Sequence, residues 1–180
     1  MSYTPSKSGI VPMPAYFDRY ILKVPGDALI PALEDSLSQW IHSDWSLLAR
    51  IGDKVYQPGK WTVRDILQHI IDTERIMSYR ALRFARADKT LLPGFDEDFF
   101  AAGAGANLRS LSALKEELVH LRMANIAMFR DFSREQMERS GICFHTEITV
   151  LALGFVLAGH QLHHFQVMQE RYYPLAASAE

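Results

Sequence analysis

Three histidines follow the most apolar stretch of this chain, in the sequence LALGFVLAGHQLHH. Residues 148–159 contain no charged side chain, and His160, His163 and His164 come directly after them. On a helix, His160 and His164 share one face, so both imidazoles can reach the same point, as two ligands of one metal ion do. His163 is rotated by about 100° from His164. We therefore expect His163 to hydrogen-bond elsewhere or to face a neighbouring chain.

A third metal ligand would have to come from another element, and His69 is the best placed. It lies in DILQHIIDTER, on the inward side of a predicted helix, whereas His42, His120 and His145 lie near element ends or beside polar residues. A single buried histidine is more often a hydrogen-bonded packing residue than a ligand. Burying several imidazoles without a common role, however, costs desolvation for each of them. The pattern therefore favours a three-histidine site over three separate packing residues.

The elements that would position these histidines are four long helices. Apolar residues recur at spacings of three and four over residues 27–49, 62–87, 112–132 and 146–173. Thr62 is a predicted N-cap with Asp65 in the first turn, and Ser133 starts a short extra turn that Gly141 stops. No strand pair is predicted. Residues 88–110 form a long connection, and connections of this length are usually functional or cover something.

This pattern predicts an all-α fold, a four-helix bundle with one long crossover between the second and third helices. Residues 1–25, with scattered prolines, are expected to form an extended arm on the surface, and residues 26–180 a single bundle domain. The fourth helix is apolar nearly all round in its first half, so it should be the most deeply buried.

Composition excludes several classes of protein. The chain has 180 residues, 48% of them hydrophobic and 22% charged, which is typical of one globular domain. A net charge of -2 without a basic run gives no footprint for nucleic acid. No signal peptide or membrane-spanning segment is predicted, so we expect a cytoplasmic protein without a membrane partner. Cys143 is the only cysteine, which excludes an intrachain disulfide and a thiolate-rich zinc site.

Two segments, WTVRDILQHIIDTER and AGHQLHH, resemble the DinB-like (DinB/YfiT-like) superfamily of bacterial four-helix-bundle proteins. The resemblance covers roughly residues 28–173, and LPGFDEDFF in the crossover is similar to a subgroup of that family. It implies one divalent transition metal (zinc, nickel or iron) held by His69, His160 and His164. It also implies hydrolysis of a small molecule, or transfer of a low-molecular-weight thiol cosubstrate such as bacillithiol or mycothiol. Members commonly pair, so we expect a homodimer, with Trp40 and Trp45 supplying an apolar patch.

Two residues close in sequence to the predicted ligands, Gln161 and Asp72, bear on the chemistry of the site. Gln161 stands where the H-E-x-x-H motif of zinc peptidases has its catalytic glutamate, so a peptidase is not expected. Asp72, three residues after His69, is a candidate general base or an orienting partner, and equally a partner of Arg75 or Arg80.

The other candidates belong to a substrate pocket. Arg80 and Arg83 continue the His69 face and would bind an anionic substrate group, or pair with the acidic run at residues 96–98. The crossover would cover the metal cavity, with Phe95, Phe99 or Phe100 lining it, and these aromatic residues could equally be part of the core.

Three readings of the function remain open. The first is a metal-dependent hydrolase or thiol transferase in which the metal activates a water or a thiolate. The second is a metal- or ligand-binding stress-response protein without turnover. The third is a helical dimer whose histidines are core residues and which binds no metal.

Overall fold

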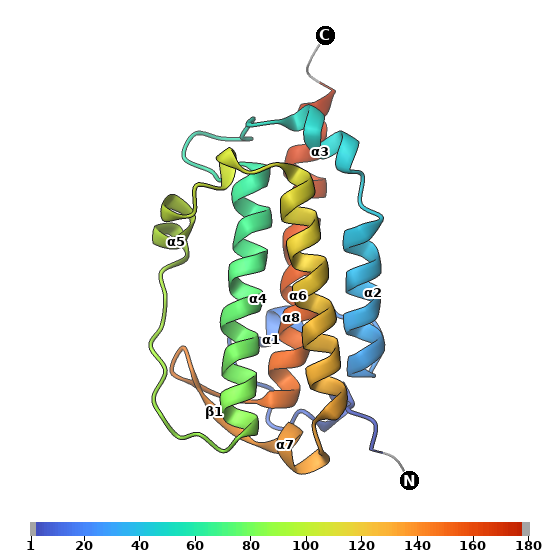
Figure 1. The fold of residues 1–180 in the computed structure, drawn as a ribbon, viewed down its shortest axis with the longest axis vertical. Helices are drawn as coiled ribbons and strands as arrows, with labels where there is room; N and C mark the ends of the chain where they lie inside the picture. Colours follow the sequence, from blue (N-terminus) through green and yellow to red (C-terminus); the bar gives the residue numbers. More distant parts are fainter. Residues whose placement is uncertain (1–2, 178–180) are drawn as a thin grey trace.

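Four long helices lie side by side and form the body of the protein (Figure 1). In the computed structural model, which describes residues 3–177, they are α2 (Leu29–Ile41), α4 (Val63–Ala85), α6 (Leu111–Asp131) and α8 (Val150–Val167). Helix α8 packs against α2 and α4, and α6 packs against the same two helices. The predicted four-helix bundle with one long crossover, between α4 and α6, is confirmed.

The helices begin where side chains can satisfy the free backbone N–H groups of a first turn. The predicted cap of α4 is a reciprocal capping box, in which Thr62 Oγ1 accepts from Asp65 N at 3.1 Å and Asp65 Oδ2 accepts from Thr62 N at 3.0 Å. Ser133 starts the short helix α7 (Arg134–Glu138), as predicted, and forms a second box with Gln136. The helix ends at Glu138, and the predicted stop, Gly141, lies in a β-strand. Local sequence therefore fixes where these helices start.

The first predicted helix, residues 27–49, is in fact two helices. Helix α2 ends at Ile41, and α3 (Trp45–Ile51) begins after a new N-cap, where Asp44 Oδ1 accepts from Leu47 N at 2.8 Å. The Asp44 side chain competes with the helical backbone for hydrogen bonds, and this interrupts a segment whose apolar period runs on unbroken. The prediction of one continuous helix was wrong at this point.

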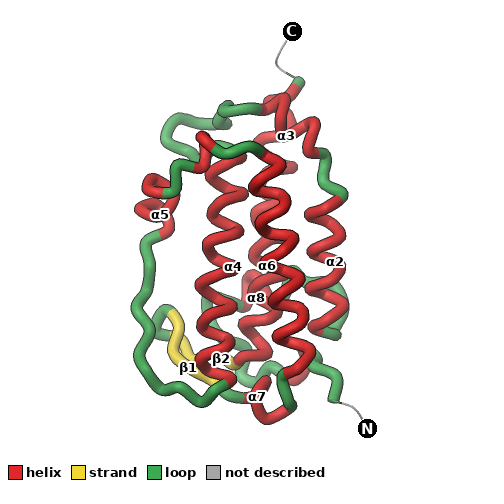
Figure 2. Tube along the Cα trace, viewed as in Figure 1, coloured by secondary structure: helices red, strands yellow, loops and turns green. Residues whose placement is uncertain are grey.

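A β-hairpin precedes α8, where no strand pair was predicted. Strands β1 (Ser140–Cys143) and β2 (Thr146–Thr149) pair in antiparallel register, beside the lower part of α4 in Figure 2. Their two-residue turn is Phe144–His145, both with positive φ (48° and 62°). Helix α8 consequently starts at Val150 rather than near Thr146. It continues into a π-helical turn, η3 (Met168–Tyr172), and a 3-10 turn, η4 (Tyr173–Ala176).

The crossover between α4 and α6 runs along the outside of α4 and carries a helix of its own. It contains α5 (Glu97–Gly103) and the 3-10 turn η2 (Ala106–Leu108), and α5 lies on the outer side of α4 and contacts it (Figure 1). Side-chain hydrogen bonds fasten it to α4 and its N-cap at both ends: Arg80 Nη2 donates to the Pro93 carbonyl at 2.7 Å, Thr62 Oγ1 donates to Asn107 Oδ1 at 2.7 Å, and Arg109 Nη1 donates to Gln68 Oε1 at 2.5 Å.

The N-terminal segment is part of the bundle rather than a surface arm. It contains a 3-10 turn, η1 (Lys7–Gly9), and a short helix, α1 (Asp18–Ile21), which packs against α8. Phe17, Ile21 and Val24 are buried. The prolines keep much of the segment extended, but these apolar side chains bury its C-terminal half, which corrects the expectation for residues 1–25.

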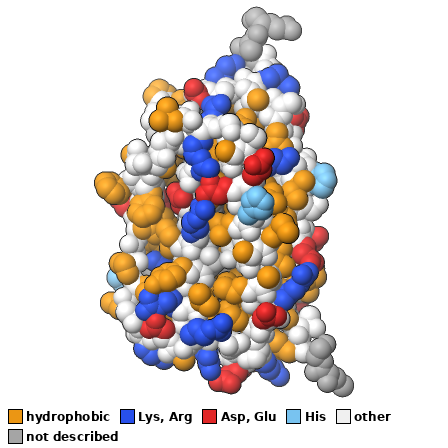
Figure 3. Space-filling model, in the orientation of Figure 1, with side chains coloured by type: hydrophobic (Ala, Val, Ile, Leu, Met, Phe, Trp, Pro, Cys, Tyr) orange, Lys and Arg blue, Asp and Glu red, His pale blue; other side chains and the backbone are white. Residues whose placement is uncertain are grey.

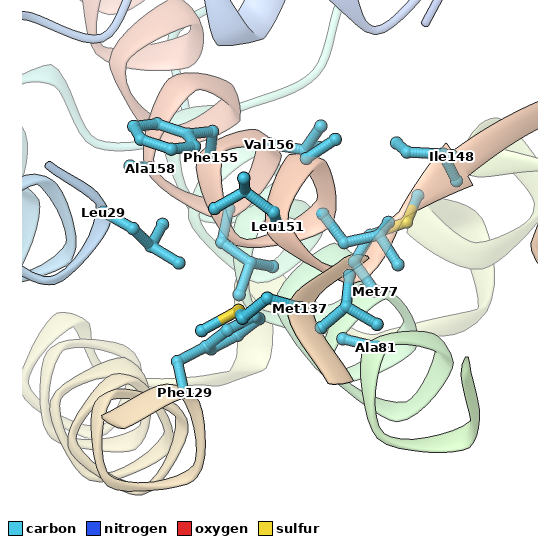
Figure 4. Close-up of a cluster of buried hydrophobic side chains, with 14 of the residues drawn as sticks. Leu29, Met77, Ala81, Phe129, Met137, Ile148, Leu151, Phe155, Val156 and Ala158 are labelled. Atoms are coloured by element: carbon cyan, nitrogen blue, oxygen red, sulfur yellow. The ribbon is translucent and has the colours of Figure 1, made fainter. Parts of the chain in front are cut away.

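Helix α8 forms the centre of the core, as predicted from its apolar surface. Every residue from 150 to 161 is buried. In Figure 4, Leu151, Phe155 and Val156 of α8 lie among side chains from α2, α4, α6 and the hairpin. Trp40 is also buried: it stacks on Phe165 and lies edge-on to Trp45 within the same chain. Trp40 therefore cannot supply the apolar patch expected for a dimer.

The surface shows no segregation of charge on the face seen in Figure 3. Basic and acidic side chains are interspersed there, with hydrophobic side chains between them. Over residues 3–177, none of the helices has both the length and the apolar character needed to cross a bilayer.

Candidate metal centre

The three predicted histidines meet at one point. His69 comes from α4, and His160 and His164 from α8. The Nε2 atom of His160 lies 3.1 Å from that of His69 and 3.1 Å from that of His164, and the potential ligand atoms of all three lie within 4.8 Å of one another. The structure thus brings together side chains that are 91 residues apart in the chain.

Burial keeps these imidazoles neutral. Desolvation lowers the pKa of His69 to about 4, partly opposed by the negative charge of Asp98. Desolvation, together with the neighbouring imidazoles, also holds the pKa of His160 and of His164 well below 6.5. A neutral imidazole carries a lone pair on one ring nitrogen, which is the form that binds a metal.

The three Nε2 atoms are better arranged to bind a cation than to hydrogen-bond with one another. His160 Nε2 faces two other Nε2 atoms but can donate at most one proton, so hydrogen bonding cannot satisfy all three atoms together. A metal ion at their common point would take a lone pair from each. The three residues therefore fit the metal that the resemblance implies.

Helix α1 approaches the site because residue 159 is glycine. A Cβ at Gly159 would lie 2.0 Å from the carbonyl oxygen of Tyr20, so the backbones of α1 and α8 meet directly beside His160. The Tyr20 ring consequently lies edge-on to His160 and His163, at centroid distances of 5.2 and 5.5 Å. Sequence analysis missed Tyr20. The signal that was available is a glycine within a buried helix, immediately before a candidate ligand.

A cavity of about 260 Å³ lies beside the histidines. Trp61 lies over His69 at one side, with ring centroids 4.8 Å apart. Besides the three histidines, the wall of the cavity consists of aromatic, acidic and small or apolar side chains. These are Tyr16, Phe17, Tyr20, Trp61, Phe95, Phe144, His163, Glu97, Asp98, Thr73, Met77 and Val156. The structure thus places Phe95 in the wall, where the sequence put it.

Two wall residues have unusual backbone conformations. Tyr16 and Phe144 have φ of 73° and 48°, in the left-handed region that non-glycine residues rarely adopt, and their rings stack at 5.8 Å. Such conformations cost about 1–3 kcal/mol each and are concentrated at functional sites. The hairpin turn and the N-terminal segment therefore both present a ring to the cavity at a cost in backbone energy.

His163 lies at the cavity and not away from it. It is half-buried in the wall, and burial together with Lys23 and Arg19 lowers its pKa. The expectation that it would face elsewhere was wrong, because the site extends past the metal-ready face of α8 toward α1.

Asp72 is not brought to the histidines. Its carboxylate accepts from Gln68 Nε2 at 2.9 Å, and it is not among the residues of the cavity wall. Burial raises its pKa, with Gln68 and Arg75 opposing the shift. The carboxylates that do line the cavity are Glu97 and Asp98 of α5, which sequence proximity to His69 could not reveal.

The two predicted substrate arginines also lie outside the wall. Arg80 is buried and donates to Pro93 and to the Cys143 sulfur, while Arg83 pairs with Asp88. Both line a neighbouring cavity of about 570 Å³, which shares only Phe95 with the histidine cavity. Neither pairs with residues 96–98, the alternative that the sequence suggested.

A second polar cluster, which sequence analysis missed, lies on the other side of α8. Arg122 Nε and Nη2 each donate to Glu74 at 2.6 Å, with both side chains almost fully buried. Asn125 Nδ2 donates to the same carboxylate at 2.9 Å, and Arg122 also contacts Ser36. Gln161 Nε2 donates to the Ser36 carbonyl at 2.7 Å. Gln161 thus belongs to this cluster and faces away from the histidines.

Comparison with known proteins identifies the family. The DinB superfamily model matches residues 27–168. The chain belongs to the DinB superfamily. The match spans α2 to α8 and includes all three clustered histidines.

One relative in sequence and one solved structure have descriptions that mention a metal-dependent hydrolase. A protein of Oceanobacillus iheyensis named "Putative metal-dependent hydrolase OB0413" is 26% identical over 144 residues, which are 72% of this chain and 82% of that protein. A solved structure from Bacillus subtilis, described as "YfiT from Bacillus subtilis is a probable metal-dependent hydrolase with an unusual four-helix bundle topology", aligns with a TM-score of 0.65. The alignment covers 94% of this chain and 91% of that one at 20% identity, which establishes a shared fold.

Proposed function

We propose that this protein is a metal-dependent hydrolase of a small molecule, with one divalent transition metal (zinc, nickel or iron) bound by His69, His160 and His164. The observation that carries the proposal is the meeting of three neutral imidazoles, two buried and that of His164 half-buried, at one point beside a cavity. Three nitrogen ligands leave a coordination position open, as catalytic sites do. The names of the relatives support hydrolysis in particular.

The residues around the cluster suit hydrolysis. A metal bound there would act as a Lewis acid and lower the pKa of a bound water toward neutrality. We assign the general-base role to Asp98, whose carboxylate lines the cavity and whose charge acts on His69. Asp98 would take a proton from the attacking water and return it to the leaving group as the substrate bond breaks. The aromatic wall would exclude bulk water from the reacting atoms.

Metal uptake tests the site directly. Protein purified without a metal-affinity tag, stripped with a chelator and titrated with zinc, nickel or iron should bind about one ion per chain. His69→Ala should weaken binding by more than the roughly 10–100-fold that loss of an outer partner of a ligand costs. His163→Ala is the matched control, because it removes a wall imidazole outside the cluster. Absence of metal uptake in the wild type would leave the histidines as core residues.

Activity assays then separate the catalytic alternatives. Metal-dependent release of nitrophenol from 4-nitrophenyl esters, lost in Asp98→Asn with metal still bound, is the expected result. Metal-dependent consumption of bacillithiol or another small thiol by an electrophile, without ester hydrolysis, would instead indicate a thiol transferase. Metal binding without either reaction would indicate a binding protein.

A further inference from the structure

The wall of the histidine cavity is acidic. Glu97 and Asp98 line it, and no lysine or arginine does so among residues 3–177. Within the same described part of the chain, neither carboxylate makes a hydrogen bond or ion pair. Glu97 is half-buried, which makes an unpaired carboxylate more costly than one in open solvent.

The two arginines that the sequence offered as partners of this acidic run are occupied elsewhere. Asp96 caps α5, with Oδ1 accepting from Phe99 N at 2.8 Å, and so sets the direction in which the next two residues project. Arg80 is held by Pro93 and Cys143, and Arg83 by Asp88 and Tyr79. Arg80 and Arg83 therefore leave Glu97 and Asp98 without a guanidinium partner from this part of α4.

The rest of the wall offers ring faces and one unused hydroxyl. Tyr20, Phe95 and Phe144 line the cavity, and the negative face of such rings attracts cations. Thr73, which is only 4% exposed, also lines it, and its Oγ1 is buried without a hydrogen-bond partner among the described residues. A buried hydroxyl is normally satisfied, so this one points independently to a bound polar ligand.

We propose that the substrate carries an ammonium group, which binds Glu97 while its apolar part lies against the rings of Tyr20 and Phe95. This inference rests on the proposed hydrolase function and names the class of substrate: a small amine derivative whose hydrolysable bond lies toward the histidines. Glu97 is the partner of the cation because it is half-buried in the wall of this cavity, whereas Asp98 is exposed and also lines two neighbouring cavities. A cavity of about 260 Å³ limits the substrate to a small molecule.

Arg19 shows that one of these rings, that of Tyr20, accepts a cation. Its guanidinium carbon lies 3.9 Å from the centroid of the Tyr16 ring and 4.9 Å from that of Tyr20. Arg19 is exposed and outside the cavity wall, but its charge opposes a second cation on the same rings. Removing this charge should therefore strengthen the binding of an ammonium ligand. Nonspecific binding of an apolar compound to the aromatic side chains would not depend on the charge of Arg19.

Three probes of the same shape test the charge preference. Benzylamine, benzyl alcohol and benzoate are titrated at neutral pH into metal-free protein and followed by NMR. Benzylammonium should bind about tenfold more tightly than benzyl alcohol, as one charge-assisted hydrogen bond predicts, and benzoate should bind most weakly. Benzoate binding most tightly, or no binding of any probe, would overturn the proposal.

Variants then locate the site. Glu97→Gln should remove the preference for benzylammonium over benzyl alcohol, and Arg19→Gln should increase it. Glu116→Gln, which removes an exposed carboxylate of α6 outside the wall, should change neither. An unchanged preference in Glu97→Gln would refute the assignment. Because these titrations use metal-free protein, their result does not depend on metal uptake. Zinc binding together with a preference for benzoate would be consistent with the hydrolase proposal and would refute the ammonium site.

Discussion

His160 and Gln161 are adjacent on α8 and both buried, yet they belong to polar clusters of opposite kinds. Gln161 faces the cluster of Glu74, Arg122 and Ser36: Arg122 donates to the Glu74 carboxylate and to the Ser36 hydroxyl, and the Gln161 amide donates to the Ser36 carbonyl. His160 faces two other imidazoles that it cannot satisfy, beside a cavity. The first cluster is closed in the sense that its side-chain donors meet acceptors of the chain, although Gln161 Oε1 is buried without a hydrogen-bond partner among the described residues. The three imidazole nitrogens of the second cluster cannot all be satisfied by one another.

The difference separates structural from functional polar groups in this bundle. Both clusters draw on α4 and α8, so burial and helix identity do not distinguish them. What distinguishes them is whether each donor meets an acceptor. Substitutions in the closed cluster should therefore change stability and leave metal binding intact.

The largest effect is expected when the closed cluster is broken. Arg122→Met leaves Glu74 buried without a counter-charge, which should lower the free energy of unfolding by about 3–5 kcal/mol. Urea denaturation followed by circular dichroism measures this. The double variant Glu74→Met/Arg122→Met should lose less than the single variant, because no uncompensated charge remains. A single variant as stable as the wild type would show that solvent reaches Glu74.

The substitution Gln161→Glu tests whether an H-E-x-x-H sequence gives hydrolytic activity when residue 161 faces away from the histidines. It restores H-E-x-x-H, but it puts a carboxyl where the Gln161 amide donates to the Ser36 carbonyl, in a side chain that is 0% exposed. We expect a loss of about 3 kcal/mol at neutral pH, from the lost donor and the cost of a buried acid, and no gain in ester hydrolysis. Faster metal-dependent hydrolysis in this variant would mean that residue 161 reaches the cavity.

Acid should destabilise the metal-free protein through the histidine cluster. His69 has a folded-state pKa of about 4 against 6.5 for an unperturbed histidine, so between these values the unfolded chain binds a proton that the folded chain does not. The free energy of unfolding is therefore highest above pH 6.5 and falls as the pH drops toward 4. Protonation of His69 in the unfolded chain alone lowers it by up to about 3 kcal/mol. Urea midpoints at several pH values measure the slope. The slope should be smaller in His69→Phe.

The smallest effect concerns the contact that brings α1 to the site. Gly159→Ala places a methyl group against the Tyr20 carbonyl and should cost about 2 kcal/mol as α1 moves away. Hydrogen exchange of residues 18–24 should accelerate while one metal ion per chain is still bound. Gly103→Ala is the control, since a Cβ there meets nothing within 4 Å. Unchanged exchange in Gly159→Ala would show that α8 can shift instead.

What the sequence predicted well depends on contacts between residues close in the chain. The capping box of Thr62 and Asp65 and the pairing of His160 with His164 involve residues three or four positions apart, where helical geometry alone sets the distance. His69 followed from its inward position and from the family resemblance. The helix periodicity also predicted the burial of α8.

What it failed to predict depends on tertiary contacts or on unusual backbone. The turn Phe144–His145 has none of the Asn-Gly or Gly signals of a two-residue hairpin, so β1 and β2 left no trace in the pattern. Asp72 was favoured because it is near His69 in sequence, but its carboxylate turns to Gln68. The acidic residues of α5 reach the site only through the path of the crossover, which no local rule describes.

The contact between Gly159 and Tyr20 also constrains when the site can form during protein synthesis. The residues that close the cavity on the α1 side leave the ribosome about 140 residues before those of α8 that they pack against, as the chain grows from the N-terminus. Until α8 has emerged, α1 lacks the helix that it packs against, and His69 has neither of its partners. The cavity and the cluster are thus completed in the same late step, so no shorter nascent chain presents a half-built metal centre.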